Sequence, residues 1–376
     1  MTLYSAYVVQ QVEMTQSATQ EQGEAVADND RIQVRCGDAY DLMADLAPES
    51  IDLLITSPPY WGLRSYGQDH NEDVLKQWLA EDSDRVQTDV PPYEWYRDHG
   101  GVLGLEPLPE WFISHLVEIL QRGAAAIKPG GSMWINIGDT YFARWSSIRH
   151  DGRQGLGDNP RSRRRTPMGG FRQEKQLLLI PSRFAIAMQD RRWILRNDLI
   201  WHKPNVPPRP EKDRLRLAHE HFFHFVKRPK EGRAKYFYDI DQVEQGARDV
   251  VYYEFEEIEP VDGDETEISY YDHQEVEEGA LDVVKTHVRS GSDGHSATFP
   301  ADLITPRILS SCPPGGTVLD PFCGTGRSLS VAAMNGRKAI GFELHKPFHE
   351  AAAKNAHEAA GQLSFELEEE GKEVGI

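Results

Sequence analysis

Six consecutive residues, Thr-Ser-Pro-Pro-Tyr-Trp, combine side chains that could hold and orient a flat ring bearing an amino group. Pro58 and Pro59 fix two φ angles and remove two backbone donors, so this loop presents rigid carbonyl groups. Tyr60 and Trp61 offer faces on which a planar ring can stack, and the Ser57 hydroxyl can accept amino hydrogens. A lone Pro-Pro-Tyr sequence is more often a rigid turn closed by a packed aromatic side chain, so other parts of the chain must decide between the two interpretations.

The chemistry that suits this loop is transfer of a group to an amino nitrogen. An amino group on a base ring is a poor nucleophile, because its lone pair is delocalised into the ring. Acceptors that hold its hydrogens favour a pyramidal nitrogen that can attack a sulfonium methyl group, and the gain in rate comes from alignment and electrostatics. The candidate catalytic residues are Ser57, Pro58, Pro59 and Tyr60.

A second loop, at residues 318–327, reads Val-Leu-Asp-Pro-Phe-Cys-Gly-Thr-Gly-Arg and is predicted to connect a hydrophobic strand to a helix. Glycines let the backbone approach a ligand closely, and doubly wound sheets bind cofactors at the carboxyl ends of their strands. Two glycines alone are also compatible with an ordinary strand-to-helix turn.

Two acids restrict the class of ligand that this second loop could bind. Asp320 ends the first strand, where its carboxylate can meet a cationic amine, and Glu343 ends the next strand, where it can accept both hydrogens of a ribose diol. The loop lacks the Gly-x-Gly-x-x-Gly spacing and the Lys-Ser/Thr pair of phosphate binders. We therefore expect a nucleoside with a charged amino-acid arm rather than a pyrophosphate.

Strand and helix patterns alternate around both loops. Strands are predicted at 31–36, 51–55, 132–137, 193–201, 317–319 and 338–342, and helices at 39–46, 108–127, 182–191, 327–335 and beyond 343. This rhythm predicts an α/β fold with a doubly wound, mostly parallel sheet, helices on both of its faces, and insertions.

Composition divides the chain into segments. We expect a flexible tail at 1–28, a catalytic part at 29–143 with an insertion or mobile loop at about 68–104, a basic flexible segment at 144–175, the rest of the catalytic part with a further basic region at 176–238, an acidic insertion at 239–290, a cofactor-binding part at 291–362 and an acidic tail at 363–376. The arginine-rich run at 144–171 has almost no aliphatic residues, so we expect it to be disordered without a partner.

The net charge of −19 is unusual for a protein that binds nucleic acid, because Lys and Arg contacts to phosphate dominate such binding. The charge is unevenly distributed. Residues 144–235 contain 23 Lys and Arg against nine Asp and Glu, whereas residues 239–282 contain 17 acids and one base. One basic window in an otherwise acidic chain favours a nucleic-acid-binding surface over a solvated charged loop.

Three cysteines, Cys36, Cys312 and Cys323, lack the spacing of metal ligands or of a disulfide framework, which favours a reducing compartment. The chain has no run of about 18 apolar residues and no basic region followed by a hydrophobic run at its start. These features predict a cytoplasmic protein without a membrane partner.

Together the two loops resemble those of the amino-methylating DNA methyltransferases of the β group, in which the catalytic motif precedes the cofactor motif. The matching segments are 37–39, 56–67, 128–139, 193–204, 295–300 and 320–326. The resemblance extends over most of residues 31–355. It implies a seven-stranded, Rossmann-like methyltransferase sheet, S-adenosylmethionine as the cofactor, and double-stranded DNA as the substrate.

The resemblance also assigns roles at the cofactor. It implies that Phe299 and Pro300 flank the methionine arm, that Asp320 and the backbone of Gly324 and Gly326 contact that arm, that Glu343 holds the ribose, that Asp38 lies near the adenine, and that Phe322 belongs to the same set.

In this group a Ser before Pro-Pro-Tyr is commoner in enzymes that methylate N4 of cytosine, and an Asp is typical of those that methylate N6 of adenine. Ser57 therefore favours cytosine. The target base must rotate out of the duplex, at a cost that stacking on Tyr60 and Trp61 can offset. The alternatives are methylation of adenine, methylation of RNA or of a protein side chain, and an inactive DNA-binding protein that retains the cofactor fold.

Further DNA contacts are expected from arginines. Arg64 is predicted to brace a phosphate, and the basic window supplies Arg161, Arg163, Arg164 and Arg165. His202 is expected to pack at a strand end, and no metal site is expected from His219, His221 and His224. A cognate restriction endonuclease is a partner compatible with the resemblance, and the sequence favours neither a monomer nor a dimer.

Overall fold

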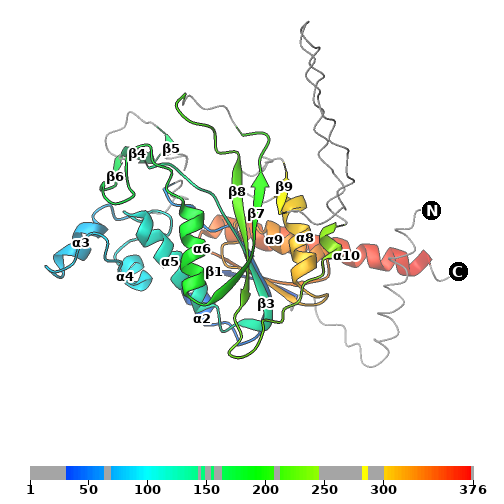
Figure 1. The fold of residues 1–376 in the computed structure, drawn as a ribbon. Coiled ribbons are helices and arrows are strands. Elements are labelled where there is room, and N and C mark those ends of the chain that lie inside the picture. Colours follow the sequence, from blue (N-terminus) through cyan, green and yellow to red (C-terminus); the bar gives the residue numbers. More distant parts are fainter. Residues whose placement is uncertain are drawn as a thin grey trace, which may run out of the picture.

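The computed structural model describes residues 31–62, 69–142, 145–148, 154–155, 163–206, 212–244, 282–286 and 300–373; of 145–148, 154–155, 163–165 and 362–373 it describes the backbone only. One large sheet organises the fold (Figure 1). Its strands are β1 (Ile32–Cys36), β2 (Ile51–Thr56), β3 (Ile127–Ile137), β7 (Trp193–His202), β8 (His219–Lys227), β9 (Val283–Lys285), β10 (Thr317–Asp320) and β11 (Lys338–Glu343).

The strand order in this sheet is β1-β11-β10-β2-β3-β8-β7-β9. The first five strands in that order are mutually parallel, β8 runs antiparallel to both β3 and β7, and β9 pairs parallel with β7. The mostly parallel, doubly wound sheet predicted from the sequence is therefore confirmed. Two strands of this sheet were not anticipated: β8, because residues 219–227 interleave histidine with phenylalanine, and the three-residue β9.

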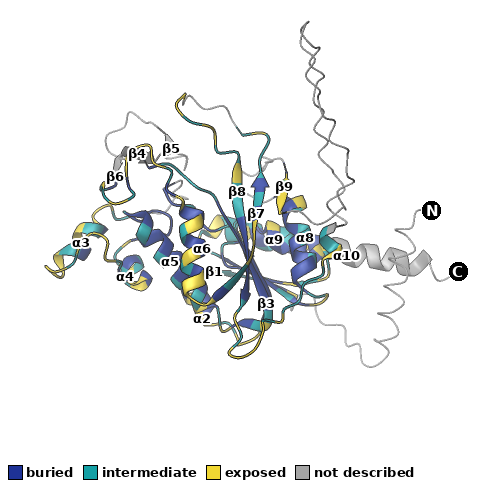
Figure 2. Cartoon of the chain, viewed as in Figure 1, coloured by how far each residue is buried: buried dark blue, intermediate teal, exposed yellow. Residues whose placement is uncertain are grey.

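Helices cover both faces of the sheet. One face carries α2 (Ala39–Ala44), α5 (Pro109–Arg122) and α6 (Ile180–Asp190), and the other carries α8 (Ala301–Ser311), α9 (Arg327–Met334) and α10 (Lys346–Glu373). Each of the six residues of β2 is buried, with Leu54 in the core on one face and Leu53 and Ile55 in the core on the other. Figure 2 shows these buried strands between helices whose outer faces are exposed. Central strands covered on both faces read as continuous apolar runs, which is why β2 was recognisable.

The insertion at about 68–104 is ordered where it is described, from residue 69. It contains α3 (Val74–Ala80) and α4 (Tyr93–Asp98). Tyr96 has no exposed surface, and its ring stacks on that of His115 in α5 with 4.8 Å between the centroids. Aromatic side chains thus extend the core into the insertion, so of the two expectations the structure favours an ordered subdomain over a mobile loop.

The basic segment, which was expected to be disordered without a partner, and the acidic tail, for which no structure was predicted, both contain regular backbone structure. A small sheet of order β5-β4-β6 contains β4 (Trp145–Ile148), β5 (Gln154–Gly155) and β6 (Arg163–Arg165), so part of the basic segment pairs its backbone without a partner molecule. At the other end of the chain α10 continues to Glu373, because the acidic tail is rich in Glu and Leu, which are good helix formers.

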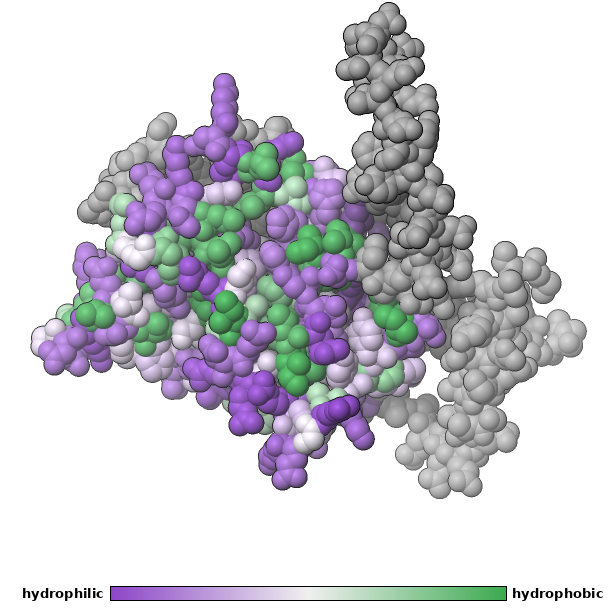
Figure 3. All heavy atoms as spheres, in the orientation of Figure 1, coloured by the Kyte–Doolittle hydropathy of each residue, from purple (hydrophilic) through white to green (hydrophobic). Residues whose placement is uncertain are grey.

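The N-terminal tail at 1–28 and most of the acidic insertion lie outside the described residues, apart from α7 (Asp241–Glu244) and β9. On the face of the molecule seen in Figure 3, hydrophobic side chains form separate patches among hydrophilic ones. No helix within the described ranges combines the length and the apolar composition needed to cross a membrane.

A buried polar cluster joins the end of the insertion to residues 56–61, the loop predicted to be catalytic. Glu106 and His115 have no exposed surface, and Glu106 Oε1 lies 3.2 Å from His115 Nδ1. The other carboxylate oxygen of Glu106 accepts a hydrogen bond from the Gly104 N–H, and its backbone carbonyl accepts one from the Trp61 indole N–H. Gly104 in turn accepts a hydrogen bond from the N–H of Gly62. The loop is therefore braced from behind by this cluster.

Replacement of Glu106 by Ala is expected to lower the free energy of unfolding by about 3 kcal/mol, because it leaves buried donors without an acceptor. Urea unfolding measures this change. Glu94→Ala, in the exposed part of the same insertion, is the control and should change the free energy by less than about 0.5 kcal/mol. Equal effects of the two substitutions would contradict the role given to the cluster.

Candidate active site

The two loops singled out from the sequence meet at the carboxyl edge of the sheet. β10 pairs with β2 in parallel, with Val318 opposite Leu53 and Leu319 opposite Leu54. Thr56 at the end of β2 donates a hydrogen bond of 2.6 Å from Oγ1 to Asp320 Oδ1 at the end of β10. Segments separated by 264 residues in the chain are thereby joined directly.

Asp320 is held by three donors. Besides Thr56, the Phe322 N–H donates to Oδ1 at 3.0 Å, and the Ser328 hydroxyl donates to Oδ2. The residue is only 2% exposed. Burial raises the pKa of this carboxyl to about 6, against the lowering effect of the Ser328, Thr56 and Phe322 hydrogen bonds. Asp320 thus fixes the start of α9 to the end of β2, and its contact with a cofactor arm stays a prediction.

In the loop at 324–326, glycine is required by helix packing as well as by the predicted close approach of a ligand. Gly326 caps α9 with a φ of +83°, and a Cβ at this position would lie 2.8 Å from the Cα of Ala352 in α10. The close approach of α10 therefore requires a glycine here. The Gly324 N–H donates to Glu343 Oε2 at 2.9 Å, so the loop and the end of β11 are also connected.

Glu343 and Asp38 lie next to each other along the same edge. β1 and β11 pair so that Cys36 is opposite Glu343, and Asp38 lies two residues beyond the end of β1. Glu343 Oε1 accepts from the His345 N–H at 2.8 Å, and burial raises its pKa. Asp38 caps α2 by accepting from the Tyr40 N–H at 2.8 Å, and its pKa is also raised, mainly by burial. Two half-buried carboxylates therefore line one end of the edge.

The remaining predicted cofactor residues are only partly placed. Phe322 packs at the margin of the core beside the glycine loop, and Pro300 is buried at the N-cap of α8. Phe299 lies outside the described residues. The roles of these three residues toward a cofactor stay predictions.

The catalytic loop is part of a hydrogen-bonded cluster. The Ser57 hydroxyl lies 3.3 Å from the Tyr60 hydroxyl and 3.4 Å from Asn136 Oδ1. The Tyr60 hydroxyl lies 2.8 Å from Asn136 Oδ1 and 2.8 Å from Glu220 Oε2. Lys203 pairs with the other carboxylate oxygen of Glu220. The structure therefore places the Ser57 and Tyr60 hydroxyls 3.3 Å apart and adds three polar side chains, whereas the catalytic roles of Ser57 and Tyr60 stay predictions.

Asn136, Glu220 and Lys203 were missed as site residues. Asn136 sits near the end of β3 and is 1% exposed, with its amide nitrogen donating to the His221 carbonyl. A polar residue at the end of an apolar strand next to the catalytic strand was a usable signal for Asn136. Glu220 had no such signal, because its importance depends on the antiparallel direction of β8, which brings the beginning of that strand to this edge.

One glycine makes room for the Tyr60 ring. A Cβ on Gly138 would lie 2.8 Å from Cε2 of Tyr60 and 3.3 Å from Cγ of Glu220. A side chain at this position would push between the tyrosine and the glutamate. The approach of Tyr60 to Glu220 therefore depends on Gly138.

Trp61 requires a correction. Its side chain is 6% exposed, packs in the hydrophobic core and donates its indole N–H to the Glu106 carbonyl at 3.0 Å. A ring buried in this way does not present a face to a base, so the role in DNA stacking predicted for Trp61 is wrong for this conformation. The half-exposed Tyr60 remains the aromatic side chain of the loop that reaches the site.

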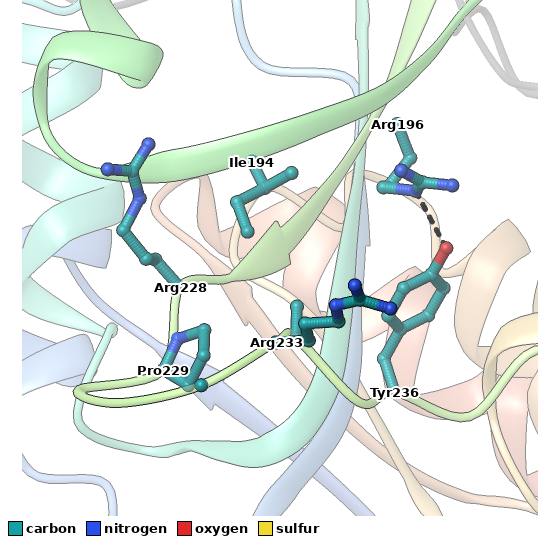
Figure 4. Close-up of a pocket in the computed structure, with 8 residues that line it drawn as sticks. Ile194, Arg196, Arg228, Pro229, Arg233 and Tyr236 are labelled. Atoms are coloured by element: carbon teal, nitrogen blue, oxygen red, sulfur yellow. Dashed lines mark hydrogen bonds between the residues drawn. The ribbon is translucent and has the colours of Figure 1, made fainter.

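The predicted DNA-contacting arginines are only partly described. Arg64 and Arg161 lie outside the described residues, and Arg163, Arg164 and Arg165 form β6, of which only the backbone is described. Other arginines of the basic window lie at the opposite edge of the sheet, where Arg196, Arg228 and Arg233 line a hollow of about 650 Å³ beside Tyr236 (Figure 4). The basic window is therefore divided between two edges.

Comparison with known proteins gives a consistent result. The family model described as DNA methylase matches residues 51–354. The Type II methyltransferase M.XycI of Xanthomonas campestris pv. cyanopsidis is 31% identical over 317 residues, which are 84% of this chain and 85% of that protein. M.Cfr9I of Citrobacter freundii, also a Type II methyltransferase, is 29% identical over 84% of each chain.

Among solved structures, the PvuII DNA methyltransferase (cytosine-N4-specific) superposes with a TM-score of 0.53. The match covers 89% of this chain and 91% of that chain at 17% sequence identity. This is a likeness of fold.

Asp320→Ala is expected to lower the free energy of unfolding by at least about 3 kcal/mol, because three donors lose their acceptor. Asp320→Asn keeps the acceptor for Thr56 and Phe322 and should cost about 1 kcal/mol. Because burial raises the folded-state pKa to about 6, the stability that wild type gains over Asp320→Asn should fall as the pH rises from about 4 to about 6 and stay constant above. Unfolding curves at several pH values measure this difference, and a difference that rises with pH would refute the assignment.

Proposed function

The chain belongs to the DNA methylase family, and on that premise we propose that it transfers a methyl group from S-adenosylmethionine to the exocyclic N4 amino group of cytosine in double-stranded DNA. The proposal rests on the Ser57 hydroxyl. Ser57 lies at the carboxyl end of β2, directly after Thr56, whose side chain donates a hydrogen bond to Asp320. Methylation of adenine at N6 is the alternative that this geometry also accommodates.

The choice of cytosine rests on Ser57. Its hydroxyl is directed toward Tyr60 and Asn136, which leaves the lone pairs of Oγ to accept a hydrogen of an incoming amino group. Together with the Ser57 and Pro58 carbonyls, this neutral acceptor holds the amino group with its lone pair turned to the methyl donor. An aspartate, which is typical of the adenine-specific members, is absent from this position.

The residues present fit the cofactor. Glu343 uses one lone pair of each oxygen to accept from Gly324 and His345, so two acceptor sites remain for the two hydroxyls of a ribose. Asp320 already has three donors, so about one acceptor site remains for a cationic amine. When bound, S-adenosylmethionine supplies a methyl group on a positively charged sulfur.

The target base would enter at the carboxyl edge of the sheet, between the loop of Ser57 and the cofactor residues Asp320 and Glu343. A flipped cytosine loses its stacking in the duplex, which costs a few kcal/mol. Tyr60 offers a half-exposed ring to replace part of that stacking, whereas Trp61 supports the loop from inside the core. Of the two aromatic residues of this loop, Tyr60 would contact the substrate and Trp61 supports the fold.

The relatives suggest a biological setting. M.XycI and M.Cfr9I are named Type II methyltransferases, so we propose that this chain also modifies a short recognition sequence and protects it from a cognate restriction endonuclease.

The substrate can be identified directly. Incubation with S-adenosylmethionine labelled in its methyl group and mixed-sequence duplex DNA, followed by nucleoside analysis, is expected to yield N4-methylcytosine. Ser57→Ala should lower the rate by about 100-fold, as for loss of one positioned donor or acceptor in an active site. N6-methyladenine as the product would select the alternative, and the absence of label in DNA would refute the proposal.

The DNA-binding surface can be tested by charge-matched variants. Replacing Arg163, Arg164 and Arg165 with Ala should weaken binding to duplexes of any sequence and reduce the slope of log affinity against log salt by about 0.9 for each phosphate that the variant no longer neutralises. The control removes the same charge from the opposite edge, at Arg196, Arg228 and Arg233. An equally weakened affinity in the two triple variants would show that net charge, and not β6, accounts for the effect.

A further inference from the structure

We propose that Glu220 is the final proton acceptor of the methyl transfer, reached from Ser57 through the hydroxyl of Tyr60. The inference rests on the proposed function, because it concerns an amino group bound at Ser57. It applies to cytosine N4 and to adenine N6 alike, since both nitrogens face the same proton balance.

Methyl transfer leaves a proton to be removed. As the nitrogen lone pair forms the new N–C bond, the S–C bond breaks and its electron pair stays on sulfur. The nitrogen then carries a positive charge and two hydrogens, of which one must leave to give the neutral methylamino group. A group that accepts this proton must be a base and must be connected to the amino group by hydrogen bonds.

The hydrogen bonds at the site form such a connection with a consistent direction. The Ser57 hydroxyl donates to the Tyr60 hydroxyl across 3.3 Å, and the Tyr60 hydroxyl donates to Glu220 Oε2 across 2.8 Å. When Ser57 Oγ takes the amino proton, its own proton can pass to Tyr60 and the tyrosine proton to Glu220. Both hydroxyls are restored, and the carboxylate alone ends with an added proton.

Asn136 cannot take the place of Glu220. Its Oδ1 lies 2.8 Å from the Tyr60 hydroxyl oxygen and 3.4 Å from the Ser57 hydroxyl oxygen, so it is as close to Tyr60 as the glutamate is. An amide oxygen accepts a hydrogen bond but does not hold a proton at neutral pH. Its amide nitrogen donates to the His221 carbonyl at 3.1 Å, which fixes the side chain with the oxygen toward the hydroxyls. Asn136 therefore aligns the two hydroxyls, and Glu220 receives the proton.

The two carboxylate oxygens of Glu220 have different partners. Its side chain is 15% exposed and pairs through Oε1 with Lys203, which leaves Oε2 for Tyr60. The Lys203 ammonium also lies 4.1 Å from the centroid of the Trp201 ring in β7, the strand next to β8. This second contact holds the ammonium beside the Glu220 carboxylate. The partial exposure of the Glu220 side chain gives the proton a route to solvent after the reaction.

The experiment compares rates of methyl transfer in a single turnover, with enzyme in excess over DNA. Glu220→Gln keeps the shape and an acceptor for Tyr60 but cannot hold the proton. We expect its rate to fall about 100-fold, with the dissociation constants for DNA and for S-adenosylmethionine within about twofold of wild type. Tyr60→Phe should fall similarly, and the double variant should be no slower than the slower single variant, because both changes interrupt one path.

Chemical rescue separates proton transfer from a structural role. Added formate or acetate should raise the rate of Glu220→Ala at least about tenfold and leave Tyr60→Phe unchanged, because only the former retains the hydroxyl that delivers the proton. Glu358→Gln is the control for replacing a lysine-paired carboxylate, since Glu358 pairs with Lys354 on the exposed face of α10. Its rate should match wild type.

The outcomes separate the two proposals. Wild-type protein that transfers no methyl group to DNA refutes the proposed function and this inference with it. Active wild-type protein with Glu220→Gln within about twofold of its rate refutes the inference alone. A slow Glu220→Gln variant whose decrease in rate tracks its melting temperature or its affinity for DNA, with no rescue of Glu220→Ala, also refutes it.

Discussion

The buried hydrogen bond from Thr56 to Asp320 is the constraint on which the site depends. It joins the ends of two adjacent parallel strands, and the same carboxylate holds the start of α9 through Ser328. A charge removed from water is costly unless donors surround it, so Asp320 stabilises the fold only while all three segments are in place. Assembly of the sheet and assembly of the site are therefore the same event.

The patterns that were readable from the sequence belong to residues whose environment is local. β2, β10 and β11 were predicted within one residue at each end, because buried parallel strands are short apolar runs that end at turns. The two loops followed from those strand ends. The surroundings of single side chains were not predictable in this way. The sequence around Trp61 is the same whether its ring faces a base or packs in the core.

β8 shows the opposite limit. Its histidines and phenylalanines alternate without a clean apolar face, because His224 is buried between aromatic rings and lies parallel to Trp134 at 4.5 Å. The position of Glu220 can be interpreted only once β8 is known to run antiparallel to β3. This direction places the beginning of β8 beside the end of β3. Chain direction within a sheet is a tertiary property, so no local spacing announces it.

The sheet order also separates the architecture of the site from the order of its motifs. β10 is late in the chain but lies between β11 and β2, and α10 returns to β1, where His349 Nε2 lies 3.2 Å from the Val34 carbonyl. If the chain were circularly permuted to begin near residue 300 and to run from α10 into β1, the glycine loop would precede the catalytic loop with every contact at the edge preserved. The order of the two loops in the sequence thus depends on where the chain termini lie in the fold. The chemistry depends only on the order of the strands in the sheet.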